Sequence, residues 1–226
     1  MVFPPVSRRA FGALSVLSAV AACTGASWAQ APGSTGGRIT IAVGGQAGLY
    51  HLPLAIADRR GFFQAEGLDV HVRDFAGGAL ALQAVHDGAA HVCSGAYEHT
   101  LRQQTQGHDY RAFVVQGRAP QQALGVSVRA VPGYRRPADL RGRRIGVSAP
   151  GSSTQVMASV LLARAGVDAR EVSFVGVGTG ATAVAALRTG RVHALCHADP
   201  IMSLLEHRSE VRLVSETAVP EREAEV

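Results

Sequence analysis

The residues best suited to chemistry are three consecutive hydroxyl side chains, Ser152, Ser153 and Thr154, which follow Gly151. The apolar residues after them recur at helical spacing, so one of these hydroxyls is expected to cap a helix that runs to Leu162. The first turn of a helix exposes unpaired N–H groups and about half a positive charge. Together with the neutral hydroxyls, they predict a site for a sulfonate, nitrate or carboxylate. The alternative is an ordinary capped helix with nothing bound.

Other candidate ligand contacts follow the carboxyl ends of predicted strands. The glycines after a strand at residues 39–43 let the backbone turn sharply and expose its N–H groups. The candidates there, and after a strand that contains Cys93, are Gly45, Gln46, Tyr50, His51, Ser94, Gly95 and Tyr97. Both tyrosines offer an apolar face with a hydroxyl donor. For His51, a packed or capping role is the alternative.

Two further candidates, Thr179 and Asp199, come from the second half of the chain. The carboxylate of Asp199 would repel an anion unless it accepts a hydrogen bond from an amine on the same solute. A taurine-like zwitterion suits such a pairing, whereas a simple inorganic anion does not.

One alternative function is an NAD-type oxidoreductase. Residues 176–181 fit the G-x-G-x-x-[G/A] fingerprint after a predicted strand at residues 172–177, and Asp199 lies near the distance of a ribose-binding acid. The chain shows no second nucleotide-binding half and no set of residues for proton transfer. We therefore expect no catalytic residues and no cofactor.

A metal-binding uptake protein is the other alternative. The available soft ligands are His91, Cys93, His99, His193, Cys196 and His197. Their spacing matches no paired zinc pattern, and cysteines in small-residue strands are commonly packing residues. The main interpretation therefore includes no metal.

The elements that must position these residues are strands and helices in alternation. A strand at residues 39–43, a helix from Pro53 to Phe63 and a strand at residues 68–72 form a parallel βαβ unit, which binds ligands at the carboxyl ends of its strands. The order helix then strand recurs at residues 77–94 and again, after about a hundred residues, at 179–198. We therefore predict two α/β lobes that share a cleft.

The boundary between these lobes is expected near residues 116–122, between strands at residues 111–115 and 124–128. Further strands are predicted at residues 145–147 and 211–214.

The segment Leu52–Val70, LPLAIADRRGFFQAEGLDV, resembles the opening of the periplasmic solute-binding proteins of ABC importers. The nearest branch is the nitrate, taurine and aliphatic-sulfonate binders, and the resemblance extends over residues 38–215. It implies a type II-like two-lobed α/β fold with lobes at 38–118 and 119–212. It also implies a small anionic or zwitterionic solute, an inner-membrane permease as partner and no enzymatic step. Proteins of this family continue beyond the length seen here, so residues 213–226 are expected to return toward a first lobe that is incomplete, with an open edge.

The N-terminal residues indicate export. Ser7–Phe11 contains Arg8 and Arg9 before an uncharged run, as in a twin-arginine signal peptide, which we place at residues 1–31. Cleavage at Ala29–Ala31 would release a periplasmic protein. Cleavage at a lipobox over residues 20–23 would instead leave Cys23 acylated and the protein anchored to the membrane.

Composition excludes several mechanisms. All 22 basic residues are arginine, which rules out a P-loop lysine or a Schiff-base lysine. The formal net charge is +5, and it falls to +3 without Arg8 and Arg9. A net positive charge this small does not indicate a nucleic-acid partner.

Overall fold

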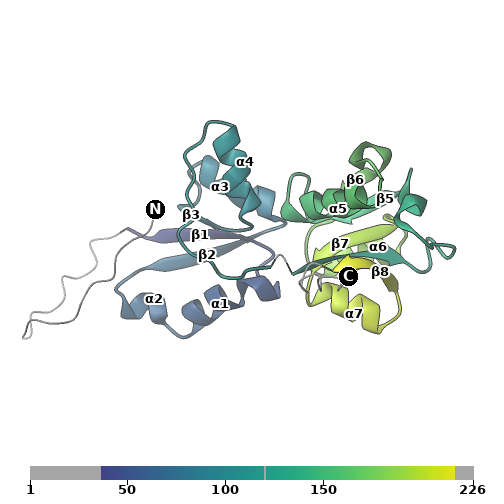
Figure 1. The fold of residues 1–226 in the computed structure, drawn as a ribbon. Helices are drawn as coiled ribbons and strands as arrows, with labels where there is room; N and C mark the ends of the chain where they lie inside the picture. The colour runs from purple at the N-terminus through teal and green to yellow at the C-terminus, as the bar shows by residue number, and fades with distance from the viewer. Residues whose placement is uncertain (1–36, 120, 217–226) are drawn as a thin grey trace, which may run out of the picture. The chain divides into compact units, whose positions relative to one another are not determined.

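The computed structural model describes residues 37–119 and 121–216, and these residues form two α/β lobes, each built around its own sheet (Figure 1). The expected signal peptide, with Cys23, lies outside the described residues. In the first lobe all strand pairs are parallel and the strand order is β2-β1-β3. The strands are β1 (Ile39–Gly44), β2 (Val70–Phe75) and β3 (Val92–Ser94). Their carboxyl ends meet at one edge of the sheet, as the strand–helix–strand order predicts.

Helices cover both faces of this sheet. They are the 3-10 helix η1 (Leu49–His51), α1 (Leu52–Arg59), α2 (Phe62–Ala65), α3 (Gly78–His86) and α4 (Glu98–Thr105). The sequence predicts one helix from Pro53 to Phe63, whereas the structure has two. The break lies at Gly61, whose φ of +71° is left-handed and therefore ends the first helix.

The residues of β1 alternate between two small cores. Ala42 packs with Ala81 and Ala84 of α3 on one face. Ile41 and Val43 pack with Leu54 of α1 on the other face. Figure 1 accordingly shows α3 and α4 on one side of the sheet and α1 and α2 on the other.

The second lobe has a five-stranded mixed sheet of order β6-β5-β7-β4-β8. Its strands are β4 (Gln122–Ser127), β5 (Arg144–Val147), β6 (Ser173–Gly176), β7 (Ala194–Ala198) and β8 (Val211–Glu216). β5 is parallel to β6 and β7, whereas β4 is antiparallel to β7 and β8. The start of β4 therefore lies beside the carboxyl end of β7.

Three helices and two 3-10 helices complete this lobe. They are η2 (Pro137–Leu140), α5 (Ser153–Arg164), η3 (Ala169–Glu171), α6 (Ala181–Arg188) and α7 (Ile201–His207). Leu162 of α5 packs with Leu124 and Cys196 on one face of the sheet. Leu187 and Leu205, from α6 and α7, pack with Leu195 on the other.

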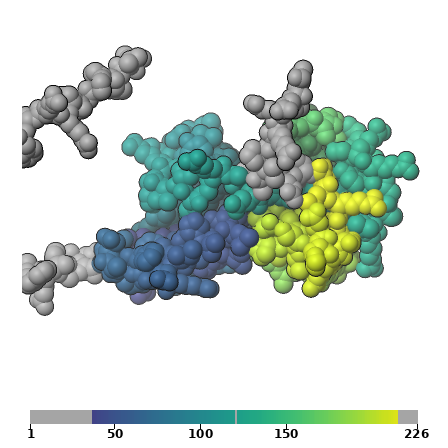
Figure 2. Space-filling model, turned by 60° about the horizontal axis from the view of Figure 1, so that its bottom comes forward, coloured from purple at the N-terminus to yellow at the C-terminus, as the bar shows by residue number. Residues whose placement is uncertain are grey.

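In Figure 2 the purple and blue residues of the first lobe and the yellow residues of the second gather in separate clusters, in line with separate cores. None of the helices in the described part of the chain is both long enough and apolar enough to cross a bilayer.

The structure bears on two further expected segments. Residues 213–216 belong to β8, which pairs with β4 in the second sheet, and the rest of the expected return segment lies outside the described residues. Val211 and Val214 face different cores of that lobe, which suits a strand covered on both sides. The strand predicted at residues 111–115 is wrong, because this segment has no regular structure and pairs with no strand of the described residues.

Candidate functional site

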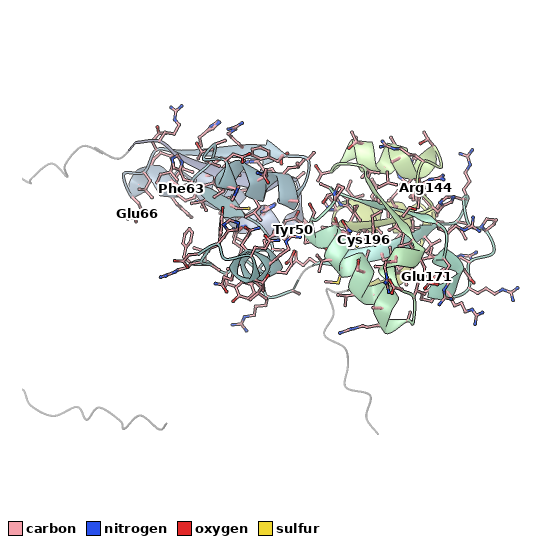
Figure 3. All side chains as sticks on the ribbon, turned by 90° about the horizontal axis from the view of Figure 1, so that it is seen from above. Tyr50, Phe63, Glu66, Arg144, Glu171 and Cys196 are labelled. Carbon is pink, nitrogen blue, oxygen red and sulfur yellow. The ribbon has the colours of Figure 1, made fainter. Side chains whose placement is uncertain are left out.

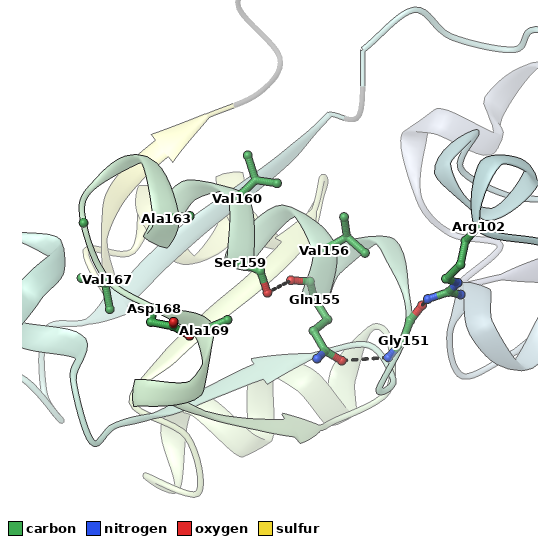
Figure 4. A pocket seen from close by; sticks show the side chains of 11 residues that line it. Arg102, Gly151, Gln155, Val156, Ser159, Val160, Ala163, Val167, Asp168 and Ala169 are labelled. Carbon is green, nitrogen blue, oxygen red and sulfur yellow. Dashed lines mark hydrogen bonds between the residues drawn. The ribbon is translucent and has the colours of Figure 1, made fainter. Parts of the chain in front are cut away.

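The first turn of α5 is held in place by its own hydroxyls and by Gln155. Ser152 is the N-cap residue, with φ −76° and ψ 162°, and is fully buried. Thr154 Oγ1 accepts a 3.0 Å hydrogen bond from the N–H of Ser148, at the end of β5. The N–H of Gly151 donates to Gln155 Oε1 at 2.8 Å (Figure 4). The turn predicted from the sequence is therefore a fixed group of hydroxyls at the carboxyl edge of the second sheet.

Gln122 adds an amide to this group. Because β4 is antiparallel to β7, Gln122 pairs with Ala198 at the carboxyl end of β7. Its Nε2 donates to Ser153 Oγ at 2.9 Å. Sequence patterns missed Gln122, because a strand that starts at a site looks like any other strand. The available signal was the pair of glutamines just before the predicted strand at residues 124–128.

The start of α5 also contacts the first lobe. The N–H of Ala79, in the first turn of α3, donates to Ser152 Oγ at 2.9 Å. Arg102 of α4 donates through Nη1 to the carbonyl of Gly151 at 2.9 Å. The Ser152 hydroxyl thus accepts a hydrogen bond from the first lobe and makes no capping bond to its own helix. The first turns of α3 and α5 consequently face each other.

The glycine loop after β1 is not an open anion site. The N–H groups of Gly45 and Gln46 both donate to Asp74 Oδ1, each at 2.9 Å. The expectation that this loop offers its N–H groups to a ligand is therefore wrong. The physical reason lies across the sheet: β2 is parallel to β1, so the side chain of Asp74 reaches the loop from the adjacent strand end.

Tyr50 and His51 pack inside the same lobe. The hydroxyl of Tyr50, labelled in Figure 3, donates to the carbonyl of Gly44 at 2.9 Å. Burial, and then the charge of Asp74, raise the pKa of Tyr50 to about 12. The rings of Tyr50 and His51 lie 4.2 Å apart between centroids. Tyr50 therefore stays protonated, and its hydroxyl donates to Gly44 within the lobe.

His51 belongs to a buried hydrogen-bond chain. Its Nδ1 lies 3.0 Å from Ser94 Oγ, which also accepts from Gln116 Nε2 at 2.9 Å. Burial lowers the pKa of His51 to about 4, although the charge of Asp74 and the carbonyl of Gly44 act in the opposite direction. The ring is therefore neutral, and the Ser94 hydroxyl links it to Gln116.

The segment after Ser94 places its predicted residues differently. Gly95 is exposed, and Tyr97 is 63% exposed directly before α4. His99, which the sequence suggested only as a soft ligand in the metal alternative, is only 3% exposed. Its Nδ1 lies 3.2 Å from Arg102 Nη2, and burial, followed by the charge of Arg102, lowers the pKa of His99 to about 4. His51 and His99 are therefore two neutral, buried histidines beside this segment.

Thr179 and Asp199 contact the loop after β1. A Cβ added to Gly45 would lie 2.8 Å from Thr179 Cγ2. The carbonyl of Asp199 accepts from the N–H of Leu49 at 3.2 Å. The carboxylate of Asp199 points elsewhere, since its Oδ1 accepts from the N–H and Oγ of Ser203 at 2.9 and 2.8 Å in α7. Asp199 is thus engaged in starting a helix.

The turn between β6 and α6 lacks the surroundings of a dinucleotide site. In that fold the ribose-binding acid follows the strand next to the fingerprint. Here β5 lies between β6 and β7, so Asp199 does not follow a neighbouring strand. A Cβ on Gly176 would also lie 3.1 Å from the ring of Pro150, which occupies the space beside the turn.

The histidines and cysteines have separate structural roles. Within residues 37–119 and 121–216, no three His, Cys, Asp or Glu side chains gather as a metal site would require. His91 and His193 have the same role in the two lobes, since Nδ1 of each accepts a hydrogen bond from a backbone N–H. The donor to His91 is Thr40 at 2.9 Å, and the donor to His193 is Arg144 at 3.0 Å. Cys196 is buried inside the second lobe (Figure 3), and burial raises its thiol pKa to about 12.

A shallow groove of about 680 Å³ runs along the outer side of α5 (Figure 4). Val156 and Val160 line it, with Arg102 at one end and Asp168 at the other. Gly151 lines this groove, whereas none of the predicted site residues does. The groove is therefore separate from the strand-end loops.

Comparison with known proteins identifies the family and the fold of the chain. The model of the family described as NMT1/THI5 like matches residues 49–219. A protein of known structure from Bordetella bronchiseptica RB50 is 53% identical, with a TM-score of 0.78, over 80% of this chain and 57% of its own. None of the curated proteins compared matches.

Two further solved structures share the fold. The alkanesulfonate-binding protein SsuA from Xanthomonas axonopodis pv. citri, bound to MOPS, is 24% identical with a TM-score of 0.63, over 80% of this chain and 61% of its own. The periplasmic nitrate-binding protein NrtA from Synechocystis PCC 6803 is 19% identical with a TM-score of 0.58, over 80% and 51%. The chain thus spans less than two thirds of the length of each. The predicted two-lobed periplasmic-binding-protein fold is confirmed.

Proposed function

Because the chain belongs to the NMT1/THI5-like family, we propose that it is the substrate-binding component of an ABC importer and binds a small anionic or zwitterionic solute. The alkanesulfonate-binding and nitrate-binding proteins that share its fold suggest the range of solutes: sulfonates, taurine-like zwitterions or nitrate. The solute would bind between the strand-end loops of the two lobes, without any covalent step.

The observation that supports this proposal most strongly is the position of the first turn of α5. Ser152, Ser153 and Thr154 lie at the carboxyl edge of the second sheet and against the first lobe. Their hydroxyls and the N–H groups of the helix start are neutral or partly positive donors, which suit an anion. Closure of two lobes around a solute would add the donors of the first lobe.

Location and partner form part of the same proposal. We take lobes at residues 38–118 and 119–212, a twin-arginine export signal at 1–31, a periplasmic location and an inner-membrane permease as the docking partner. The possible lipid anchor at Cys23 is tested by Cys23→Ala and cell fractionation. A shift from the membrane to the soluble periplasmic fraction supports lipidation, whereas a soluble wild-type protein supports cleavage at Ala29–Ala31.

Thermal unfolding of the purified protein against a ligand panel tests the function. The panel contains ethanesulfonate, taurine, nitrate, sulfate, amino acids, pyrimidines, NAD and zinc. At a concentration 100 times Kd, a bound solute stabilises the folded state by about 2.7 kcal/mol, which raises Tm by roughly 5 to 10 °C. We expect such a rise with at least one of the sulfur oxyanions or nitrate.

The same panel separates the alternatives. A rise with NAD alone would favour the oxidoreductase, and a rise with zinc alone would favour the metal-uptake protein. Either result, with no response to any anion or zwitterion, contradicts the proposed function.

A further inference from the structure

The two lobes differ strongly in charge. Residues 121–216 contain 12 arginines and 7 acidic residues, whereas residues 37–119 contain 7 of each. The positive charge of the described chain therefore belongs to the second lobe. Charge concentrated in one half of a chain suggests a partner of opposite charge, such as a membrane or a nucleic acid. The position of these arginines on the lobe indicates which partner they fit.

The arginines gather at the amino edge of the second sheet, where β5 and β7 begin and β4 ends. The N–H of His193, just before β7, donates to the carbonyl of Arg144 at 2.8 Å, and its carbonyl accepts from Ser127 at 2.9 Å. The N–H of Val128 then donates to the carbonyl of Glu210, directly before β8, at 3.0 Å. Four strands thus meet in one continuous row, and Figure 3 shows Arg144 at this end of the second lobe.

Six exposed arginines come from the segments that form this row, and we call them the arginine rim: Arg129, Arg135, Arg143, Arg144, Arg208 and Arg212. Within residues 37–119 and 121–216, none of the six forms an ion pair with an acidic side chain. The acidic residues nearby are paired with other arginines: Arg136–Asp139, Arg141–Glu171 and Arg188–Glu210. The positive charge of the rim is therefore largely left for a partner.

Backbone carbonyls hold three of the six guanidinium groups. The three hydrogen bonds run from Arg144 Nε to Arg191, from Arg129 Nη1 to Arg188 and from Arg212 Nη1 to Tyr134, at 2.6, 3.3 and 3.1 Å. A carbonyl orients a guanidinium without cancelling its charge, and each guanidinium keeps further N–H donors. Burial, followed by the charges of Arg144 and Arg143, lowers the pKa of His193, in line with a positive field at this edge.

The surroundings of the rim fit a surface of phosphate groups better than a protein segment. Protein interfaces have an apolar core with aromatic anchors, and no large apolar side chain of residues 128–144, 188–193 or 208–212 is exposed. The row of four strands spans about 14 Å, because neighbouring strands lie about 4.8 Å apart, and this length exceeds a single phosphate ion. A protein exported as proposed above meets membrane lipid rather than nucleic acid.

We propose that the arginine rim binds the phosphate groups of an anionic phospholipid surface. This inference goes beyond the proposed function, because it assigns a second binding surface to the second lobe. The rim lies at the amino ends of β5 and β7, whereas the hydroxyls at the start of α5 and Asp199 follow the carboxyl ends of these strands. The lobe can therefore hold lipid and solute at the same time.

Co-sedimentation with lipid vesicles tests the rim. The full chain carries Cys23→Ala, so that no acyl chain contributes, and the vesicles contain phosphatidylcholine alone or with an equal part of phosphatidylglycerol. We expect binding to the vesicles with phosphatidylglycerol only. This binding should fall at least tenfold between about 0.1 M and about 1 M NaCl, since the screening length shrinks from about 10 Å to about 3 Å.

The decisive variant is the pair Arg135→Gln and Arg143→Gln, whose side chains make no hydrogen bond in the described part of the chain. Each arginine near an anionic surface strengthens binding about fivefold, so the pair should weaken it about 25-fold. The matched control is Arg59→Gln with Arg60→Gln, two exposed arginines of the first lobe, which changes the net charge equally and should bind as the wild type does. If the rim pair fails to fold in urea denaturation, Arg143→Gln alone should show the fivefold loss.

Several results would overturn the rim. Equal binding to both kinds of vesicle, or equal losses in the rim pair and the control pair, would show that these arginines do not recognise the lipid. Binding to immobilised polyglutamate but not to phosphatidylglycerol would indicate an acidic protein as the partner instead. Inorganic phosphate that competes more strongly than NaCl at the same ionic strength would indicate a site for a single ion. None of these results depends on the ligand panel, so this inference and the proposed function fail separately.

Discussion

Asp74 accepts the backbone N–H of Gly45 at 2.9 Å, from the end of one parallel strand to the loop that follows its neighbour. The same oxygen accepts the N–H of Gln46. A glycine loop of this kind can bind a negatively charged group through its backbone N–H groups, and here the side chain of Asp74 takes that place. The Asp74 side chain therefore holds the shape of this loop, and its carboxylate occupies the N–H groups of Gly45 and Gln46.

Replacing Asp74 should loosen this loop. Asp74→Ala leaves two N–H groups without their acceptor, and we expect a loss of about 1 to 3 kcal/mol in the free energy of unfolding. Asp74→Asn keeps one acceptor oxygen and should cost about half as much. Urea denaturation measures both, and hydrogen exchange at Gly45 and Gln46 should speed up in Asp74→Ala.

Asp69→Ala is the control for the loss of a carboxylate. Asp69 makes an exposed ion pair with Arg38, and its removal should cost less than about 1 kcal/mol. Equal losses for Asp74→Ala and Asp69→Ala would contradict the role given to Asp74.

Acid should destabilise the protein through His51 and His99. The folded-state pKa of each is about 4, below the ordinary value of 6.5, so the unfolded chain binds protons first as the pH falls. Stability is complete above about pH 6.5, declines down to about pH 4 and then levels off for these groups. Each histidine contributes up to about 3 kcal/mol, and the lowered pKa of buried His197 acts in the same direction.

Urea denaturation at several pH values between 7.5 and 4.5 measures this decline. The double variant His51→Gln and His99→Gln should flatten the profile, whereas His86→Gln should leave it as in the wild type. A wild-type profile that is already level across this range would refute the assignment.

Gly44 allows β1 and the start of α3 to touch. A Cβ at Gly44 would lie 2.3 Å from the backbone nitrogen of Gly78. Gly44→Ala should therefore force the backbones apart and cost about 3 kcal/mol or more. Gly67→Ala meets nothing within 4 Å and disturbs only a φ of +71°, so it should cost about 1 to 2 kcal/mol. Melting curves that show the reverse order would disprove the close approach.

Residues 113–115 form an exposed apolar segment, with Phe113 and Val115 exposed by 76% and 79%. Such a patch promotes self-association. The pair of substitutions Phe113→Ser and Val115→Ser should lower light scattering at high protein concentration and leave Tm nearly unchanged. Leu68→Ser, at an isolated leucine exposed by 41%, should change neither measurement. A large fall in Tm for the pair would show that these side chains support the fold.

What the sequence could predict was local. Alternating Ile39, Ile41 and Val43, and the hydroxyl run before α5, locate β1 and the helix start because neighbours along the chain decide them. The predicted strand at residues 111–115 failed because a strand also needs a partner to pair with.

The site itself depended on contacts across the fold. Asp74 reaches the glycine loop from another strand, and Gln122 reaches Ser153 because β4 is antiparallel. His99 gains its neutral state from burial and from Arg102 one turn later. No periodicity or motif in a single sequence records these distances, so the chemical type of site could be predicted and its residues only in part.

The segment that joins the lobes is tied at both of its ends to hydroxyls of the candidate site. Gln116 donates to Ser94 in the first lobe, and Gln122 donates to Ser153 in the second. A solute that displaced Ser94 or Ser153 would therefore break one of these two hydrogen bonds, and we expect its binding to alter the connection between the lobes.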